Sequence, residues 1–283
     1  MSKSKGNAVT PTDLLREHGT DAVRYWATSA RLGVDTAIDL AQIKVGRRLA
    51  IKILNAGRFV LSFGQAAGAS QALDSQAAAS QPDPGQITER LDQAFVRRLA
   101  EVAEQCTAAL DAYDHAAALE HAERFFWFFC DDYLELVKSR AYGEHGEAAA
   151  SSALATLRLG LSVLLRLLAP FLPFVTEEVW SWRQDGSIHR AKWPAPAELR
   201  AQAGPGDDAV IAAAAAAIAA IRKAKSQARL PMKNPIPLLI ATAGSDGLEA
   251  LAAASRDVRS AGHVGEIELR RMDGADLVLN VVV

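Results

Sequence analysis

Apolar residues recur at spacings of three and four along most of the chain, a pattern typical of amphipathic helices. The clearest case is residues 40–62, where one half of the helical wheel is apolar and the other half is basic. Its apolar half consists of Val45, Leu49, Ala50, Ile53, Leu54, Ala56, Val60 and Leu61. The same spacing predicts long helices at 40–62, 88–113, 115–142 and 147–168.

Shorter helices are marked by their end signals. Thr10-Pro11 followed by Asp13 is typical of a helix start, because Thr can cap and Pro suits the first helical position. Gly19 ends this helix. A second helix runs from Asp21 to about residue 30, and a third begins at Pro173.

The pattern changes after residue 196. An Ala-rich helix is predicted at 206–228 and a shorter one at 246–254. Between turn residues lie three apolar stretches that read as strands, at 236–242, 265–272 and 276–283. Asp273-Gly274 predicts a hairpin between the last two. The fold class we predict is mainly α, a helical bundle followed by a small α/β C-terminal domain.

Residues 64–87 break the helical pattern. They are almost entirely Gly, Ala, Ser, Gln, Asp and Pro, with Pro82-Asp83-Pro84-Gly85 near the end. Such a stretch cannot bury enough apolar surface to form a core element. We predict a mobile linker or long surface loop within the bundle.

Charge and composition narrow the function classes. The 283 residues carry 31 Lys and Arg against 33 Asp and Glu, a formal charge of −2, so nucleic-acid binding needs a local patch. No apolar run reaches the roughly 20 residues of a membrane span, and residues 1–20 lack the apolar segment of a signal peptide. Cys106 and Cys130 fall within helical patterns, which predicts reduced core thiols and no metal site. We expect a cytoplasmic protein without membrane contact.

The basic half of the helix at 40–62 is the first candidate site. No acidic residue interrupts positions 41–63. The residues on this half, which we call the basic stripe, are Lys44, Arg47, Arg48, Lys52, Asn55, Arg58 and Phe59. Cations neutralise phosphates, and a ring stacked on an unpaired base contributes about 1–3 kcal/mol. Spacing alone leaves open a solvated basic face balanced by acids elsewhere, with Phe59 packed under a neighbouring helix.

The second candidate is the N-terminal run Met1-Ser2-Lys3-Ser4-Lys5-Gly6-Asn7. Its lysines, hydroxyls and glycine suit a loop that grips a polyphosphate. A solvated basic N-terminus is the simpler alternative. The residues alone do not decide between them.

Other clusters have plainer interpretations. The aromatic run at 125–129 with Tyr133 points all round a helix, so we predict buried core. Asp131 and Asp132 have no metal-type partner at helical spacing, which favours salt bridges. A second basic cluster, at the end of the Ala-rich helix, consists of Arg222, Lys223, Lys225, Arg229 and Lys233. It fits either RNA contact or a solubilising helix end.

Several motifs together resemble the class I aminoacyl-tRNA synthetases. Met1 to Ser4 match the last four positions of the Lys-Met-Ser-Lys-Ser signature loop of that family. The stretches that resemble its valine–tRNA ligases are SARLGVDT (29–36), LNAGRFV (54–60), FCDDYLELVKSRAY (129–142), APFLPFVTEEVW (169–180) and SIHRAKWP (187–194). The resemblance runs from residue 1 to about 235. SARLGVDT favours the valine enzymes over the isoleucine and leucine enzymes.

This resemblance implies a function and a domain plan. Lys3 would stabilise the leaving pyrophosphate as catalytic residue, and Met1, Ser2, Lys3 and Ser4 would contact ATP. Residues 1–39 would end the catalytic domain with the signature loop and its bracing helices. Residues 40–185 would form the anticodon-binding bundle, in which the basic stripe contacts tRNA, and residues 186–283 a junction and the α/β domain. The implied cofactors are ATP and Mg²⁺, and the implied partners are valine tRNAs and L-valine, with the protein a monomer.

Two parts of such an enzyme are missing from the sequence. The chain has no His-x-Gly-His element, which binds ATP in the family, and no inserted editing domain. We therefore expect the C-terminal part of a valine–tRNA ligase, inactive in adenylation by itself. The alternatives are a stand-alone tRNA-binding module and the same part of an isoleucine–tRNA ligase.

Overall fold

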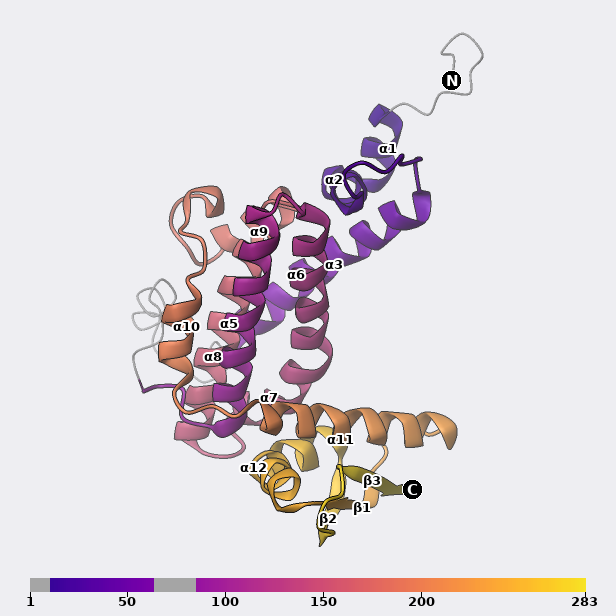
Figure 1. Ribbon diagram of the computed structural model, residues 1–283, viewed down its shortest axis with the longest axis vertical. Helices are drawn as coiled ribbons and strands as arrows, with labels where there is room; N and C mark the ends of the chain where they lie inside the picture. Colours follow the sequence, from indigo (N-terminus) through magenta and orange to yellow (C-terminus); the bar gives the residue numbers. More distant parts are fainter. Residues whose placement is uncertain (1–10, 64–84) are drawn as a thin grey trace. The chain divides into compact units, whose positions relative to one another are not determined.

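A computed structural model describes residues 11–63 and 85–283, which form helices and one small sheet (Figure 1). The first helices are α1 (Pro11–His18), α2 (Thr20–Ser29), α3 (Leu40–Ser62), α5 (Arg90–Asp111), α6 (His115–Phe128), the π-helical turn η2 (Phe129–Tyr133) and α7 (Leu134–Ala141). They are followed by α8 (Glu147–Leu168), α9 (Pro173–Ser181), the 3₁₀ turn η3 (Ile188–Arg190), α10 (Pro196–Ala203) and α11 (Asp208–Gln227). The last elements are β1 (Ile236–Ala243), α12 (Ser245–Gly262), β2 (Val264–Arg271) and β3 (Val278–Val282).

This architecture confirms the predicted fold class of a mainly α chain with a small α/β part at its C-terminal end. Helices α3 and α8 begin and end at the predicted residues. Asp39 explains the sharp start of α3, because its carboxylate accepts the N–H groups of Ala41 at 2.7 Å and Gln42 at 3.3 Å. Helix α10 is an element that the pattern did not predict. Most of the predicted linker, residues 64–84, lies outside the described residues.

The chain divides into two compact units. The first comprises residues 1–80, 102–124 and 161–194, and the second residues 81–101, 125–160 and 195–283. The boundaries predicted at residues 39 and 185 stay predictions.

In the first unit, two glycines let α3 pack closely on its neighbours. A Cβ added at Gly46 would lie 2.5 Å from the Tyr25 Cβ in α2, and one at Gly57 would lie 2.5 Å from the Val179 Cγ1 in α9. The buried positions of α3 share this side: Ile43, Gly46, Leu49, Ile53, Ala56, Gly57 and Val60. Contacts with α2 and α9 therefore set which face of α3 is left to solvent.

Polar contacts hold α2 in the same unit. The Asp21 carboxylate accepts the N–H groups of Phe174 at 3.1 Å and Val175 at 2.8 Å, at the start of α9. Burial raises the pKa of Asp21, and these two hydrogen bonds oppose the shift. The Tyr25 hydroxyl donates to Glu123 at 2.7 Å. Because Asp21 caps a helix that also contacts α3, it indirectly fixes α3 as well.

The core of the second unit contains the aromatic cluster. Phe125, Phe126, Phe129 and Tyr133 are at most 5% exposed, which confirms the prediction of a core. The rings of Phe95 and Tyr133 stack with centroids 3.9 Å apart. The predicted single helix at 115–142 is wrong in one respect: η2 interrupts it with a π turn between α6 and α7. Such a turn inserts one extra residue, which periodicity over so long a stretch does not reveal.

A buried ionic network crosses this core. Arg140 donates to both carboxylate oxygens of Asp92 at 2.7 and 2.8 Å and, through Nε, to Asp257 at 2.8 Å. The Tyr133 hydroxyl at 2.8 Å and the Ser152 hydroxyl at 2.6 Å also donate to Asp92. Arg140 and Asp92 are fully buried. The network joins α5, α7 and α8 to α12 of the α/β part.

The sheet corrects one prediction. Its strand order is β2-β1-β3, with β1 parallel to β2 and antiparallel to β3, so β2 and β3 do not pair. The Asp273-Gly274 turn exists, with Gly274 at φ 74°. It does not pair β2 with β3, because the two strands lie on opposite sides of β1. Beside this turn, the N–H of Met272 donates to the carbonyl of Ala243, and the N–H of Gly244 donates to the carbonyl of Ala275. β1 lies between the other two strands; α12 packs on β1 and β2, and α11 packs on β3, as Figure 1 shows beside the strands.

Helix α8 has the length and apolarity of a membrane span, as does the bent pair α10–α11 among the described residues. In α8, however, 67% of the most apolar window is buried inside the protein. That burial is the arrangement of a core helix, so no membrane protein is indicated.

Candidate nucleic-acid interface

The basic stripe lies on the solvent face of α3, opposite the side that packs on α2 and α9. Five of its seven side chains are exposed: Lys44, Arg47, Arg48, Asn55 and Arg58. Lys52 and Phe59 are half-buried. The helix therefore brings all seven residues to one surface, as the periodicity predicted.

Two cations of the basic stripe have no acidic partner in the described part of the chain. Among the described residues, Lys44 and Arg48 have no carboxylate within 4.0 Å. Arg47 donates to the backbone carbonyl of Glu17 at 2.8 Å, a contact that orients the guanidinium without cancelling its charge. An exposed cation without a carboxylate partner is available to a phosphate.

The C-terminal end of the stripe is aromatic. Phe59 meets Phe63 edge to face, with ring centroids 4.8 Å apart. The Arg58 guanidinium lies 5.8 Å from the centre of the Trp182 ring, a cation–π contact. Sequence reasoning missed Trp182, since nothing in the spacing links residues 58 and 182. Phe59 is thus partly engaged within the protein, and a base could reach only its remaining exposed surface.

The second basic cluster does not form one open patch. Arg222 pairs with Asp132 at 2.6 Å, which also confirms the salt bridge predicted for the Asp131-Asp132 pair. Lys225 is only 1% exposed and donates to the carbonyls of Met232 at 2.7 Å and Gly262 at 2.9 Å. Burial lowers the pKa of Lys225. Two of the five predicted cations therefore have structural partners.

Met1, Ser2, Lys3 and Ser4 lie outside the described residues, so the phosphate-binding role of this loop stays a prediction. The helices that follow it, α1 and α2, are described and pack on α3.

The remaining candidate chemistry is structural. Cys106 and Cys130 are buried and unpaired with each other, as predicted for core thiols. Burial raises the pKa of Cys106 to about 12, so its thiol is not a nucleophile at neutral pH. Across residues 11–63 and 85–283, no group of three or more His, Cys, Asp or Glu side chains could hold a metal ion.

Comparison with known families agrees with the geometry. Residues 92–240 match the anticodon-binding domain of tRNA ligase, and residues 1–39 match the class I tRNA synthetases of the I, L, M and V group. The first match covers more than half of the chain.

Individual relatives agree with this result. The chain is 50% identical to the valine–tRNA ligase of Thermobifida fusca over 99% of its own length, and 48% identical to that of Salinispora tropica over 96%. It spans only 30% and 32% of the length of these two relatives.

A solved structure shows the same fold. LeuRS from Agrobacterium radiobacter K84, crystallised in a ternary complex with tRNA and LeuAMS, superposes with a TM-score of 0.51 at 22% identity. The match covers 71% of this chain and 22% of that one. At this identity the likeness concerns the fold alone, and the family follows from the sequence matches. The chain belongs to the family of the anticodon-binding domain of tRNA ligase, and its sequence is similar to valine–tRNA ligases along nearly its whole length.

Proposed function

We propose that this chain serves a valine–tRNA ligase as its tRNA-recognising part, in an enzyme that joins L-valine to its tRNA through valyl-adenylate. The observation that carries the proposal is the 50% identity to a valine–tRNA ligase over 99% of the chain. The isoleucine alternative is disfavoured, because the similar relatives found at 46–50% identity are valine enzymes.

The basic stripe is the part of the fold that would contact tRNA. Its exposed cations suit the phosphates of an RNA hairpin, and the exposed part of the Phe59 ring suits an unstacked base. The close contacts at Gly46 and Gly57 keep α3 in a fixed orientation in its unit. Binding on a rigid helix costs little ordering entropy, which favours specific recognition.

The N-terminal residues would serve the chemical step. Adenylation releases pyrophosphate, and a lysine that meets its developing charge lowers the barrier. By resemblance this lysine is Lys3, with Met1, Ser2 and Ser4 as further ATP contacts. Mg²⁺ would neutralise phosphate charge when ATP is bound. The protein would work in the cytoplasm as a monomer.

Direct binding tests the recognition role. The double variant Lys44→Glu/Arg48→Glu in the full chain should bind a valine tRNA transcript about a hundredfold more weakly, because each of the two phosphate contacts contributes roughly tenfold to the affinity. Arg190→Glu is the matched control, since Arg190 is an exposed arginine of the same unit outside the stripe. Filter binding at fixed salt measures both. Equal affinity of the double variant and the unchanged chain would remove the stripe from the proposal.

Pyrophosphate exchange tests the catalytic role. The chain alone should give no valine-dependent exchange between ATP and labelled pyrophosphate, because it has no His-x-Gly-His element. Turnover above the rate without valine would contradict this assignment.

A further inference from the structure

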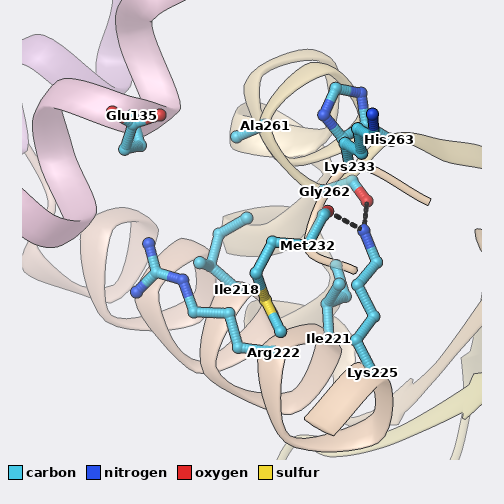
Figure 2. Close-up of a pocket in the computed structure, with 10 residues that line it drawn as sticks. All are labelled: Glu135, Ile218, Ile221, Arg222, Lys225, Met232, Lys233, Ala261, Gly262 and His263. Carbon is cyan, nitrogen blue, oxygen red and sulfur yellow. Dashed lines mark hydrogen bonds between the residues drawn. The ribbon is translucent and has the colours of Figure 1, made fainter. Parts of the chain in front are cut away.

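Two adjoining cavities in the second unit lie along α7, beside the C-terminal parts of α11 and α12. The first has a volume of about 310 Å³ and is lined by α11 residues, the loop at 232–233 and the end of α12 (Figure 2). The second, of about 500 Å³, is lined by α7, the loop after it and the last turn of α12. Glu135, Ala261 and His263 line both cavities, so the two adjoin, and we call them together the groove.

The groove is cationic in a chain whose net charge is −2. Five basic side chains line it: Lys138, Arg222, Lys225, Lys233 and Arg259. Against these stand two lining carboxylates, Glu135 and Glu144, and Asp132, which pairs with Arg222, so five positive and three negative charges leave +2 when His263 is not counted. Such a local excess attracts an anion despite the charge of the whole chain.

Two of these cations have no internal carboxylate partner. Lys233 and Arg259 are exposed, and within the described residues neither has a carboxylate within 4.0 Å. Lys138 and Arg222 differ, because they pair with Glu135 at 3.3 Å and Asp132 at 2.6 Å. Figure 2 shows Arg222 and the pair Lys233 and His263 at opposite ends of the first cavity, with Met232 between them.

Lys225 removes an obstacle to anion binding. The C-terminal end of a helix carries about half a negative charge, which would repel a phosphate from the end of α12. The Lys225 ammonium donates to the carbonyl of Gly262, the last residue of α12, and to that of Met232 (Figure 2). No carboxylate among the described residues lies within 4.0 Å of Lys225, so its charge offsets the helix end.

The groove also offers apolar and aromatic surface. Ile218, Ile221 and Met232 line the first cavity, and Tyr142, which is 57% exposed, lines the second. Flat aromatic and apolar surfaces beside cations are what a base and its phosphate require together.

We propose that this groove binds a single-stranded segment of RNA, with Lys233 and Arg259 on phosphates and Tyr142 stacked on a base. The groove lies in the second unit, whereas the basic stripe lies in the first, so the site is additional to the proposed tRNA contact and rests on that function only for RNA as the partner. RNA is favoured over a free nucleotide because the two cavities adjoin and cations line both.

The test uses the full chain and a labelled single-stranded oligoribonucleotide, with binding followed by fluorescence anisotropy. Lys233→Gln/Arg259→Gln should lower the affinity about a hundredfold, at roughly tenfold per phosphate contact, and flatten the dependence of log affinity on log salt by about 0.7 for each contact. Tyr142→Ala should weaken binding at least about fivefold, and Tyr142→Phe should restore it because the ring is kept.

The control is Lys223→Gln, an exposed cation on α11 that lines neither cavity. It should change the affinity less than about twofold. A reduction equal to that of the groove variants would mean diffuse attraction and overturn the site. Unchanged binding in the double variant would overturn it too, and would leave an acidic protein segment as the occupant to consider. Circular dichroism confirms that each variant is folded.

Two further experiments distinguish RNA from a free nucleotide as the ligand, and the groove from the basic stripe as the binding site. AMP and inorganic phosphate should compete no better than their ionic strength predicts; competition at micromolar AMP would make this a free-nucleotide site and overturn the RNA assignment. Lys44→Glu/Arg48→Glu should still bind the oligoribonucleotide at this groove. Weaker binding confined to that variant would contradict the groove and leave the proposed function standing.

Discussion

The two basic clusters of the sequence differ in how many of their cations are exposed and unpaired in the fold. The basic stripe on α3 and the cluster at the end of α11 each contain five cations. In the first unit, Lys44 and Arg48 face solvent without an acidic partner in the described residues. In the second unit, Arg222 pairs with Asp132 and Lys225 is buried against two carbonyls.

The difference shows that the number of cations in a stretch does not give the charge available to a ligand. On α3 the cations recur opposite a continuous apolar side, so they have to face water. Half of the α11 residues are alanine, and small side chains let neighbouring segments approach the cations closely. Arg140 is the clearest case of a structural cation, because it is fully buried and its charge is paired within the core.

The largest effect should come from Arg140→Ala. It would leave the carboxylates of Asp92 and Asp257 buried without their cation, at a cost of about 3–5 kcal/mol in the free energy of unfolding. Arg48→Ala is the control and should stay within about 0.5 kcal/mol of the unchanged chain. Urea unfolding followed by circular dichroism measures both. If the two variants cost the same, the contrast between structural and available cations is wrong.

The pH dependence of that destabilisation sharpens the same point. Burial raises the pKa of Asp257, and the Arg140 charge opposes the shift, so removing Arg140 should raise this pKa further. A carboxyl group with a higher pKa in the folded chain favours folding at low pH and loses this contribution as pH rises through the folded pKa. The deficit of Arg140→Ala should therefore be smaller at about pH 5 than at about pH 7. A deficit that grows on acidification would contradict the assignment.

Lys225→Met should have an intermediate effect. Methionine keeps an unbranched apolar side chain, one atom shorter than lysine, but leaves the carbonyls of Met232 and Gly262 without their donor, which costs about 1–3 kcal/mol. The exposed neighbour Lys223 supplies the control, Lys223→Met, which should be nearly neutral. Thermal unfolding distinguishes the two. Equal midpoints would show that Lys225 has no structural role.

The elements that the sequence predicts correctly are those that depend on periodicity and local caps. The bounds predicted for α3 are correct at both ends because a long apolar repeat begins directly after Asp39. The predicted hairpin between β2 and β3 is wrong because a turn signal specifies a bend and not the partner of a strand. The place of β1 between the other two strands depends on tertiary packing, in which α12 contacts β1 and β2 and α11 contacts β3.

The site is predictable in part for the same reason. The basic stripe follows from the helical repeat of a single element. The groove at the end of α12 cannot be predicted from the sequence, because Lys233, Arg259 and Tyr142 come from three segments that meet only in the fold. The burial of Lys225 likewise depends on the carbonyl of Gly262, which is 37 residues away.

The smallest effect, and the most direct test of the contrast, should come from Asp132→Asn. It breaks the pair with Arg222, whose side chain is 40% exposed, and should cost no more than about 1 kcal/mol of stability. Because Arg222 lines the proposed RNA groove, its released charge should raise the affinity of the full chain for a single-stranded oligoribonucleotide by about twofold to fivefold. Glu266→Gln removes the same charge from an exposed position of β2 outside the groove and should raise it less. Equal gains would show that Arg222 responds only to net charge. A gain specific to Asp132→Asn would show that one ion pair decides whether a cation on α11 serves the fold or a ligand.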